Sequence, residues 1–191
     1  SITLWLPLRN RNKIADETIQ NQPVIDTTTK AESASGSCLC GAVEFRVYFP
    51  TRWCVHCHCS MCRIAHGAAF VTWVGVLRDQ FEFISGEKHL NWYGSSEPAS
   101  RGHCNRCGSS LLFQSSRWED EIHVTLASFV NAIDRSPAAH VFFDNHVDWA
   151  KLGDDLKRYP ETQFPAIDNL VCTATPISPP NPLLLNAYSA S

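Results

Sequence analysis

Cysteine spacing constrains the fold of this chain more than any other feature of its sequence. Seven of the nine cysteines fall into two groups. The first group combines Cys38 and Cys40 with the later pair Cys104 and Cys107, and the second consists of Cys57, Cys59 and Cys62. Such Cys-x-Cys and Cys-x-x-Cys spacings in a chain of 191 residues favour metal binding in a reducing compartment over the disulfide framework of a small secreted protein.

The four cysteines of the first group can close a tetrahedral site, which is typical of structural zinc. Cys38 and Cys40 are two positions apart, so an extended strand directs both sulfurs to one face. Cys104 and Cys107 enclose a tight turn, and Gly108 permits the backbone conformation that such a turn needs. A zinc ion here would tie the start of the domain to its end and contribute on the order of 10 kcal/mol to folding. One or two disulfides within this group are the alternative.

The second group offers only three sulfurs, which leaves one coordination position open for water or a substrate. Cys57 and Cys59 share one face of a predicted strand, and Cys62 follows in a short predicted helix. We therefore predict a catalytic zinc ion at this group. His66, one helical turn beyond Cys62, is an alternative fourth ligand that would make the site purely structural. His58 lies between two ligands and is expected to point away from the metal.

A zinc ion held by three thiolates carries a net charge of about −1, which weakens its ability to activate water. Its natural role is to bind a substrate thiol and hold it as the reactive thiolate. This argument predicts the making or breaking of a carbon–sulfur bond on a thiol substrate. Of the two remaining cysteines, Cys54 is expected to face away from Cys57 as a buried apolar residue, and Cys172 is unassigned.

Charge and hydropathy limit the kinds of partner that we expect. The net charge is −3 and no block of Lys or Arg is present, so the sequence offers no basic surface for nucleic acid or an anionic membrane. The apolar segment 2–8 is too short to span a membrane, and the basic residues that follow it reverse the order of a signal peptide. We predict a cytoplasmic protein with a small-molecule partner.

The hydrophobic pattern predicts a mainly β, mostly antiparallel domain over residues 36–162. Residues 1–35 are predicted to form a polar N-terminal extension, and residues 163–191 a Pro-rich C-terminal tail. Strands are expected at 42–48, 68–76, 80–84, 89–93, 109–114 and 122–127. Short helices are expected at 60–66, where Gly67 ends the pattern, and at 148–156.

Several segments of this domain occur together in one known family. They are Ser37–Phe45, Cys57–Arg63, Gly67–Phe70, Cys104–Leu111, His123–Phe129 and the later segment Trp149–Pro160. In combination they resemble the glutathione-dependent formaldehyde-activating enzyme family, which also includes centromere protein V. The resemblance covers about residues 36–160 and neither terminal segment.

The resemblance implies a zinc-stabilised β-tent fold, built from small antiparallel sheets with short helices. It also implies two zinc ions per chain, a structural ion on Cys38, Cys40, Cys104 and Cys107 and a catalytic ion on Cys57, Cys59 and Cys62. The implied activity is that of a carbon–sulfur lyase, the synthesis of S-(hydroxymethyl)glutathione from glutathione and formaldehyde. The thiol partner is then glutathione or a glutathione adduct.

Other readings of the same residues stay open at this point. Arg63 and Arg101 are candidates for pairing with glutathione carboxylates, although arginines that serve the structure or face solvent are common. The alternative function is a non-catalytic, zinc-stabilised binding module, because the tent fold also occurs in a nucleotide-exchange chaperone and in a chromosome-associated protein. Zinc storage or redox sensing is a third.

Overall fold

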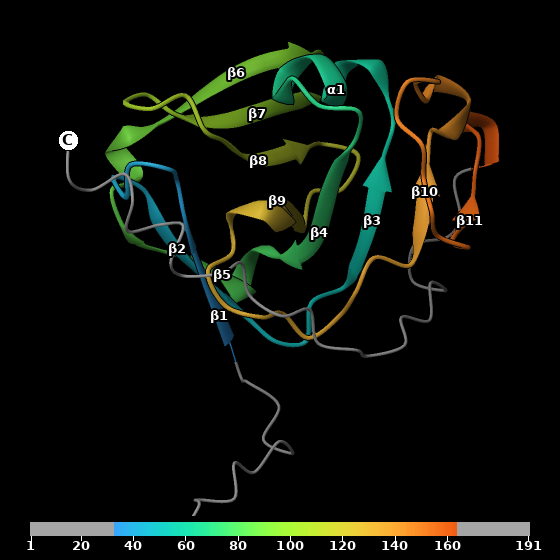
Figure 1. Cartoon of the computed structure of the whole chain (residues 1–191). Helices are drawn as coiled ribbons and strands as arrows, with labels where there is room; N and C mark the ends of the chain where they lie inside the picture. Colours follow the sequence, from blue (N-terminus) through green and yellow to red (C-terminus); the bar gives the residue numbers. More distant parts are fainter. Residues whose placement is uncertain (1–32, 164–191) are drawn as a thin grey trace, which may run out of the picture. The chain divides into compact units, whose positions relative to one another are not determined.

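The computed structural model of this chain describes residues 33–163, which form two β-sheets and one short α-helix (Figure 1). The smaller sheet has the order β1–β2–β5, with β1 at Ser33–Ser37, β2 at Glu44–Tyr48 and β5 at Phe81–Ser85. The larger sheet has the order β11–β10–β3–β4–β9–β8–β7–β6. In chain order its strands are β3 (Trp53–Cys57), β4 (Val71–Leu77), β6 (Leu90–Ser96), β7 (Ala99–Cys104), β8 (Ser110–Ser115), β9 (Glu121–Thr125), β10 (Ala139–Val141) and β11 (Lys157–Arg158).

Neighbouring strands are antiparallel except at one edge of the larger sheet. There β10 pairs in parallel with both β3 and β11, and Figure 1 shows these late strands continuing the sheet beyond β3. The mainly β fold class with antiparallel sheets is therefore confirmed, although the larger sheet has eight strands. The parallel pairing places a segment from the end of the domain beside the strand that carries Cys57.

The α-helix α1 spans Ser60–His66, as the sequence predicts. The Cys59 sulfur accepts a hydrogen bond from the Cys62 backbone N–H at the start of the helix. The helix ends at Gly67, which adopts the left-handed conformation (φ 59°) that a residue without a Cβ enters at little cost. Short 3-10 turns complete the described structure at η1 (Arg78–Gln80), η2 (Glu87–His89), η3 (Leu126–Ser128), η4 (Phe143–Asn145) and η5 (Glu161–Gln163).

The helix predicted at 148–156 is wrong, because these residues form turns and irregular backbone. The Asp154 carboxylate accepts a hydrogen bond from the Leu156 N–H, and this local bond competes with helical hydrogen bonding. The sequence also gives no signal for β7, whose residues are mostly small or polar. That strand exists because β6 and β8 pair with it on both sides.

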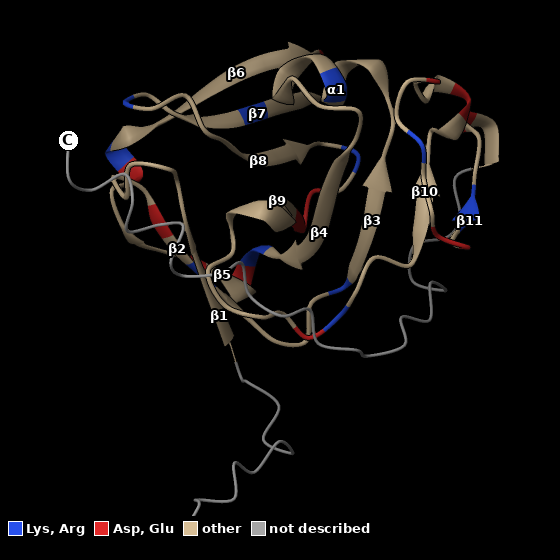
Figure 2. Cartoon of the chain, viewed as in Figure 1, with Lys and Arg blue, Asp and Glu red and all other residues tan. Residues whose placement is uncertain are grey.

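The predicted terminal segments, 1–35 and 163–191, lie almost entirely outside the described residues, as does Cys172. The first strand already begins at Ser33, inside the expected extension. Within residues 33–163, no helix has the length and apolar character of a membrane span. Lys and Arg residues are scattered over several elements, among them α1, β7 and β11, and acidic residues lie between them (Figure 2).

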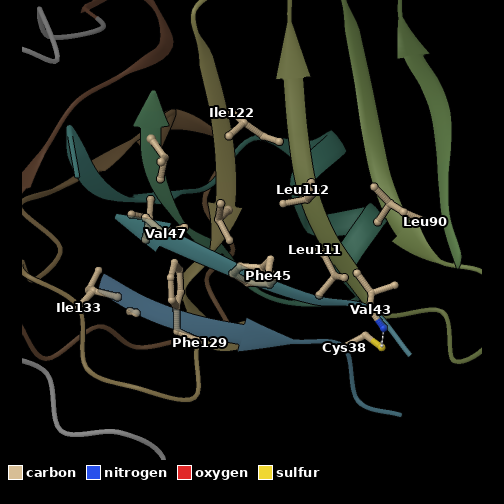
Figure 3. Close-up of a cluster of buried hydrophobic side chains, with 14 of the residues drawn as sticks. Cys38, Val43, Phe45, Val47, Leu90, Leu111, Leu112, Ile122, Phe129 and Ile133 are labelled. Carbon is tan, nitrogen blue, oxygen red and sulfur yellow. Dashed lines mark hydrogen bonds between the residues drawn. The ribbon is translucent and has the colours of Figure 1, made fainter. Parts of the chain in front are cut away.

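Side-chain alternation gives the larger sheet two apolar faces. One face packs against the smaller sheet, and Phe45 and Val47 of β2 share a buried cluster there with Leu112 of β8 and other aliphatic residues (Figure 3). Cys54 belongs to this core and is fully buried, which confirms its predicted role. The opposite face carries a second cluster, which includes Trp53, Cys57 and Trp73. The alternation along β3 therefore sends Cys54 and Cys57 to different faces.

Candidate functional site

The four cysteines of the first group come together at the edge of the first core. Their sulfur atoms all lie within 4.8 Å of one another. Cys38 follows β1 and Cys104 ends β7. The Cys38 and Cys40 sulfurs are 3.6 Å apart, and those of Cys40 and Cys104 are 3.9 Å apart. These separations are far longer than a disulfide bond of about 2.05 Å, and all four cysteines are free thiols in the structure.

Backbone groups around this cluster favour negatively charged sulfur. The Val43 N–H donates to the Cys38 sulfur at 3.3 Å (Figure 3), and the Arg106 N–H donates to the Cys104 sulfur at 3.4 Å. Gly108 adopts a φ of 76°, which lets its N–H reach the Cys104 carbonyl oxygen at 2.9 Å and closes the turn. Hydrogen bonds to a thiolate stabilise it, so the donor set suits a cation that prefers thiolates.

The pKa shifts of the cysteines in this cluster also favour a bound cation. Burial and hydrogen bonding to Cys40, Cys104 and Cys107 raise the pKa of Cys38 to about 12, although the hydrogen bond from the Val43 N–H acts to lower it. Burial would also raise the pKa of Cys107, but hydrogen bonds from Ser109 outweigh it and lower the value to about 6. Sulfurs this close cannot all ionise without a cation between them, and a divalent metal would supply it.

The three cysteines of the second group converge on the other face of the larger sheet. Their sulfurs also lie within 4.8 Å of one another. Cys57 is the buried last residue of β3, Cys59 precedes α1, and Cys62 is the buried residue of that helix. The close spacing of the ligands in sequence and the turn into α1 together produce this arrangement.

The pKa values of the three sulfurs in the second group shift in different directions. Hydrogen bonds from Cys57 and Cys59 lower the pKa of Cys62 to about 2, with further contributions from the charge of Arg101 and from Trp73. Hydrogen bonding to Cys59 and Cys62, together with burial, raises the pKa of Cys57 well above its ordinary value. The three sulfurs can all be thiolates only if a cation neutralises their charge, as in the first group.

The two candidate arginines take different positions. Arg101 of β7 is 9% exposed, and both of its terminal nitrogens lie 3.6 Å from the Cys62 sulfur. Its guanidinium group also lies over the Phe113 ring, 5.2 Å from the centroid. Arg63 instead donates from Nε to the His58 carbonyl oxygen at 3.1 Å. Arg101 therefore supplies a positive charge directly at the cluster.

Neither nearby histidine belongs to the group of three sulfurs. The His66 ring packs edge-on against Trp73 at 5.3 Å, and burial lowers its pKa. The His58 ring points to His140, with 2.8 Å between His58 Nε2 and His140 Nδ1. Among the residues that the structure describes, the second group thus consists of three cysteine sulfurs.

A cavity of about 380 Å³ opens beside the second group. Its wall includes all three cysteines and several aromatic side chains, and Arg101 and Arg117 contribute positive charge. The aromatic residues of this wall are Trp53, Trp73, Phe113, Trp118, His123 and Phe142. None of the four cysteines of the first group lines it. A larger hollow of about 620 Å³ lies elsewhere and includes only Cys38 from either group.

A polar network at one wall of this cavity is not apparent from the sequence. Glu121 accepts hydrogen bonds from the Trp53 indole N–H at 3.1 Å and pairs with His123 Nε2 at 3.2 Å and Arg52 at 3.1 Å. Trp53 can lie over β4 because its cross-strand partner is Gly75, where a Cβ atom would meet the indole at 2.1 Å. Alternation within 121–125 places Glu121 and His123 on one face, but only the sheet order brings Trp53 to them.

A family model and one curated relative indicate the same family. The family model described as "Glutathione-dependent formaldehyde-activating enzyme" matches residues 33–145. A Halomonas elongata protein named "Putative glutathione-dependent formaldehyde-activating enzyme" is 31% identical over 125 residues, which are 61% of this chain and 79% of the relative. A Schizosaccharomyces pombe protein named as an uncharacterized lyase is 30% identical over 78 residues, 41% of this chain and 55% of that protein.

One solved structure resembles part of the fold. A crystal structure of a Rhodobacter sphaeroides protein superposes with a TM-score of 0.44 and 21% sequence identity. The superposition covers 65% of this chain and 98% of the other chain. A similarity at this level assigns neither fold nor function.

Proposed function

Because this chain belongs to the glutathione-dependent formaldehyde-activating enzyme family, we propose that it is a carbon–sulfur lyase that acts on glutathione or a glutathione adduct. In the synthetic direction, the thiol loses its proton and the sulfur forms a bond to the formaldehyde carbon. The π-electron pair of the C=O bond moves to the oxygen, which takes up a proton. The product is S-(hydroxymethyl)glutathione.

We propose that both cysteine groups hold zinc, so that each chain carries two ions. Cys57, Cys59 and Cys62 would hold the catalytic ion, and Cys38, Cys40, Cys104 and Cys107 the structural one. A zinc ion on the three-cysteine group would supply the positive charge that keeps a substrate thiol in its nucleophilic thiolate form. Both groups need their sulfurs reduced, which favours a compartment such as the cytoplasm.

The observation that carries this proposal is the different surroundings of the two cysteine groups. The three-cysteine group lines the cavity of about 380 Å³, where a substrate thiol can approach its sulfurs. The four-cysteine group has a full set of ligands and takes no part in that cavity. A binding module stabilised by zinc has no need of an incomplete ligand set beside a cavity, so the arrangement favours an enzyme.

Arg101 supports thiolate chemistry through its charge. A divalent ion with three thiolates has a net charge of about −1, and a fourth thiolate from the substrate would make it about −2. The guanidinium group of Arg101, 9% exposed and 3.6 Å from Cys62, offsets one of these charges at a site with little water to screen it. Arg101 therefore favours the form of the site in which the substrate thiol is ionised.

The cavity also suits the other groups of glutathione, which carries carboxylates and an ammonium group. Arg117 lines the cavity and is exposed, and within residues 33–163 its guanidinium group has no side-chain hydrogen bond or ion pair. Glu161 lines the same cavity and is also exposed. Opposite charges over aromatic walls are complementary to a zwitterionic peptide, and we propose that Arg117 pairs with a substrate carboxylate.

Exchange spectroscopy by NMR tests the proposed reaction. With glutathione and formaldehyde at equilibrium, the zinc-loaded protein should speed exchange between free and hydroxymethylated thiol without shifting the equilibrium. Cys59→Ser should abolish the acceleration, whereas Cys54→Ala, which changes a buried cysteine on the opposite face of β3, should retain it. If the wild type gives no acceleration but binds glutathione, the substrate is another adduct. If it does not bind glutathione at all, the enzyme assignment is wrong.

A further inference from the structure

Three side chains form a line of hydrogen bonds that ends between two of the candidate zinc ligands. An Asp154 oxygen lies 3.0 Å from His140 Nε2, and His140 Nδ1 lies 2.8 Å from His58 Nε2. His140 is 0% exposed and His58 is 2% exposed, whereas the Asp154 side chain reaches the surface. His58 is the residue between Cys57 and Cys59. The reaction proposed above does not use any of these three residues.

The carboxylate sets the direction of the first of these hydrogen bonds. A carboxylate only accepts, so His140 donates to Asp154 from Nε2, and its Nδ1 is the nitrogen that shares a hydrogen bond with His58 Nε2. His58 Nε2 has this one hydrogen-bond partner. Its other ring nitrogen, Nδ1, is buried and has no hydrogen-bond partner among the described residues. The orientation of the His58 ring thus depends on one hydrogen bond, the bond to His140.

The backbone of His58 is fixed by the same surroundings. Its N–H donates to the Val141 carbonyl oxygen of β10 at 3.0 Å, and its own carbonyl oxygen accepts from Arg63 of α1 at 3.1 Å. The ring packs against Phe70 and Phe143, at centroid distances of 5.2 and 5.0 Å. Hydrogen bonds to β10 and to Arg63 of α1, together with the packing of the ring, therefore hold the segment that carries Cys57 and Cys59.

We propose that Asp154 and His140 are positioning residues that act through His58 to hold Cys57 and Cys59 in place for the metal. The inference rests on the zinc ion proposed for the three-cysteine group. A ligand segment that is already ordered loses less conformational freedom on binding, so the ion should leave slowly. Loss of outer-shell hydrogen bonds typically weakens metal affinity by about 10- to 100-fold.

Adjacent aspartates provide a matched pair of variants. Asp154→Ala removes the carboxylate that bonds His140. Asp155→Ala removes an exposed neighbouring carboxylate that, within residues 33–163, makes no hydrogen bond to His140. His140→Phe removes the bond to His58 and keeps an aromatic ring in the cluster. Zinc release into excess chromophoric chelator should show one phase for each cysteine group, the faster from the three-cysteine group because it lacks a fourth protein ligand.

We expect Asp154→Ala and His140→Phe to speed only the faster phase, by about tenfold. Asp155→Ala should release both ions at wild-type rates. Asp154→Ala leaves the buried His140 Nε2–H without its partner, so some loss of Tm is expected, but its slower phase of zinc release should keep the wild-type rate. Cobalt-loaded Asp154→Ala should show altered d–d absorption from the three-cysteine group. A general loss of stability would not change this absorption.

The outcomes separate this inference from the proposed metal centre. If wild-type protein retains two zinc ions and both Asp154→Ala and His140→Phe release them at wild-type rates, the positioning role is wrong. The positioning role is also wrong if Asp155→Ala speeds zinc release as much as Asp154→Ala does. If the wild type binds a single zinc ion and Cys59→Ser does not change that content, the metal centre and the positioning role are both wrong.

Discussion

The guanidinium group of Arg101 lies 3.6 Å from the Cys62 sulfur through both of its terminal nitrogens, although 39 positions separate the two residues. The contact joins β7 to α1 across the cavity wall. It places a buried positive charge beside Cys62, and this charge helps hydrogen bonds from Cys57 and Cys59 to lower the pKa of that thiol. The contact therefore links the larger sheet to the chemistry proposed for the cluster.

Arg101→Met is expected to lower kcat/KM for glutathione and formaldehyde by about tenfold or more, because a hydrogen bond to a charged group contributes roughly 1.5–3 kcal/mol. Methionine keeps apolar contact with Phe113 but removes the charge. Arg101→Lys should recover part of the activity. Arg78→Met is the control, since Arg78 bonds to Glu119 and Gln114 outside this cavity. Unchanged kinetics in Arg101→Met would show that the charge has no role in the reaction.

Cys104→Ser and Cys59→Ser should have different consequences. Cys104→Ser breaks a closed four-sulfur site that joins β7 to the residues after β1, so we expect a large loss of Tm or aggregation. Cys59→Ser should leave the protein folded with little change in Tm, but inactive. Thermal unfolding followed by circular dichroism compares the two variants. Equal and large losses of Tm would contradict the division into structural and catalytic groups.

Arg117→Gln is expected to raise KM for glutathione by up to about fivefold and to leave kcat unchanged, because an exposed ion pair contributes at most about 1 kcal/mol. The kinetics with a neutral thiol such as 2-mercaptoethanol should not change. Arg78→Gln serves as the control for a lost surface charge. An equal rise in KM for the neutral thiol would mean that Arg117 does not recognise a carboxylate.

Glu121→Gln should destabilise the protein at pH 7 by about 1–3 kcal/mol, because Arg52, Trp53 and His123 lose a charged partner. Burial alone would raise the pKa of Glu121, but hydrogen bonds from His123 and Trp53 and the charge of Arg52 lower it below its ordinary value of 4.5. The carboxylate therefore stabilises the fold fully above pH 4.5, and this contribution is lost as the pH falls through the lower folded value.

Urea denaturation in the presence of zinc measures this dependence for the wild type and Glu121→Gln. Both proteins share the cysteine groups, so the difference between their free energies of unfolding isolates Glu121. That difference should be constant from neutral pH down to about pH 5 and should narrow at lower pH. A difference that instead widens as the pH falls would contradict the direction of the pKa shift.

Local spacing determined much of the candidate site. Cys57, Cys59 and Cys62 are so close in sequence that a strand and one turn of helix suffice to bring their sulfurs together. Strand alternation alone separates Cys54 from Cys57, and the structure places them in different clusters. Hydrophobic periodicity likewise predicted the mainly β class and the helix at Ser60–His66, because these features depend on neighbours a few residues apart.

Only the tertiary structure decided which distant residues meet at the cysteines. Parallel pairing of β10 with β3 brings His140 to His58, and the place of β7 in the sheet brings Arg101 to Cys62. The cavity and the bonds between Trp53 and Glu121 have the same origin. Periodicity gives the face on which a side chain lies but not the order of strands, because that order depends on the packing of the whole sheet.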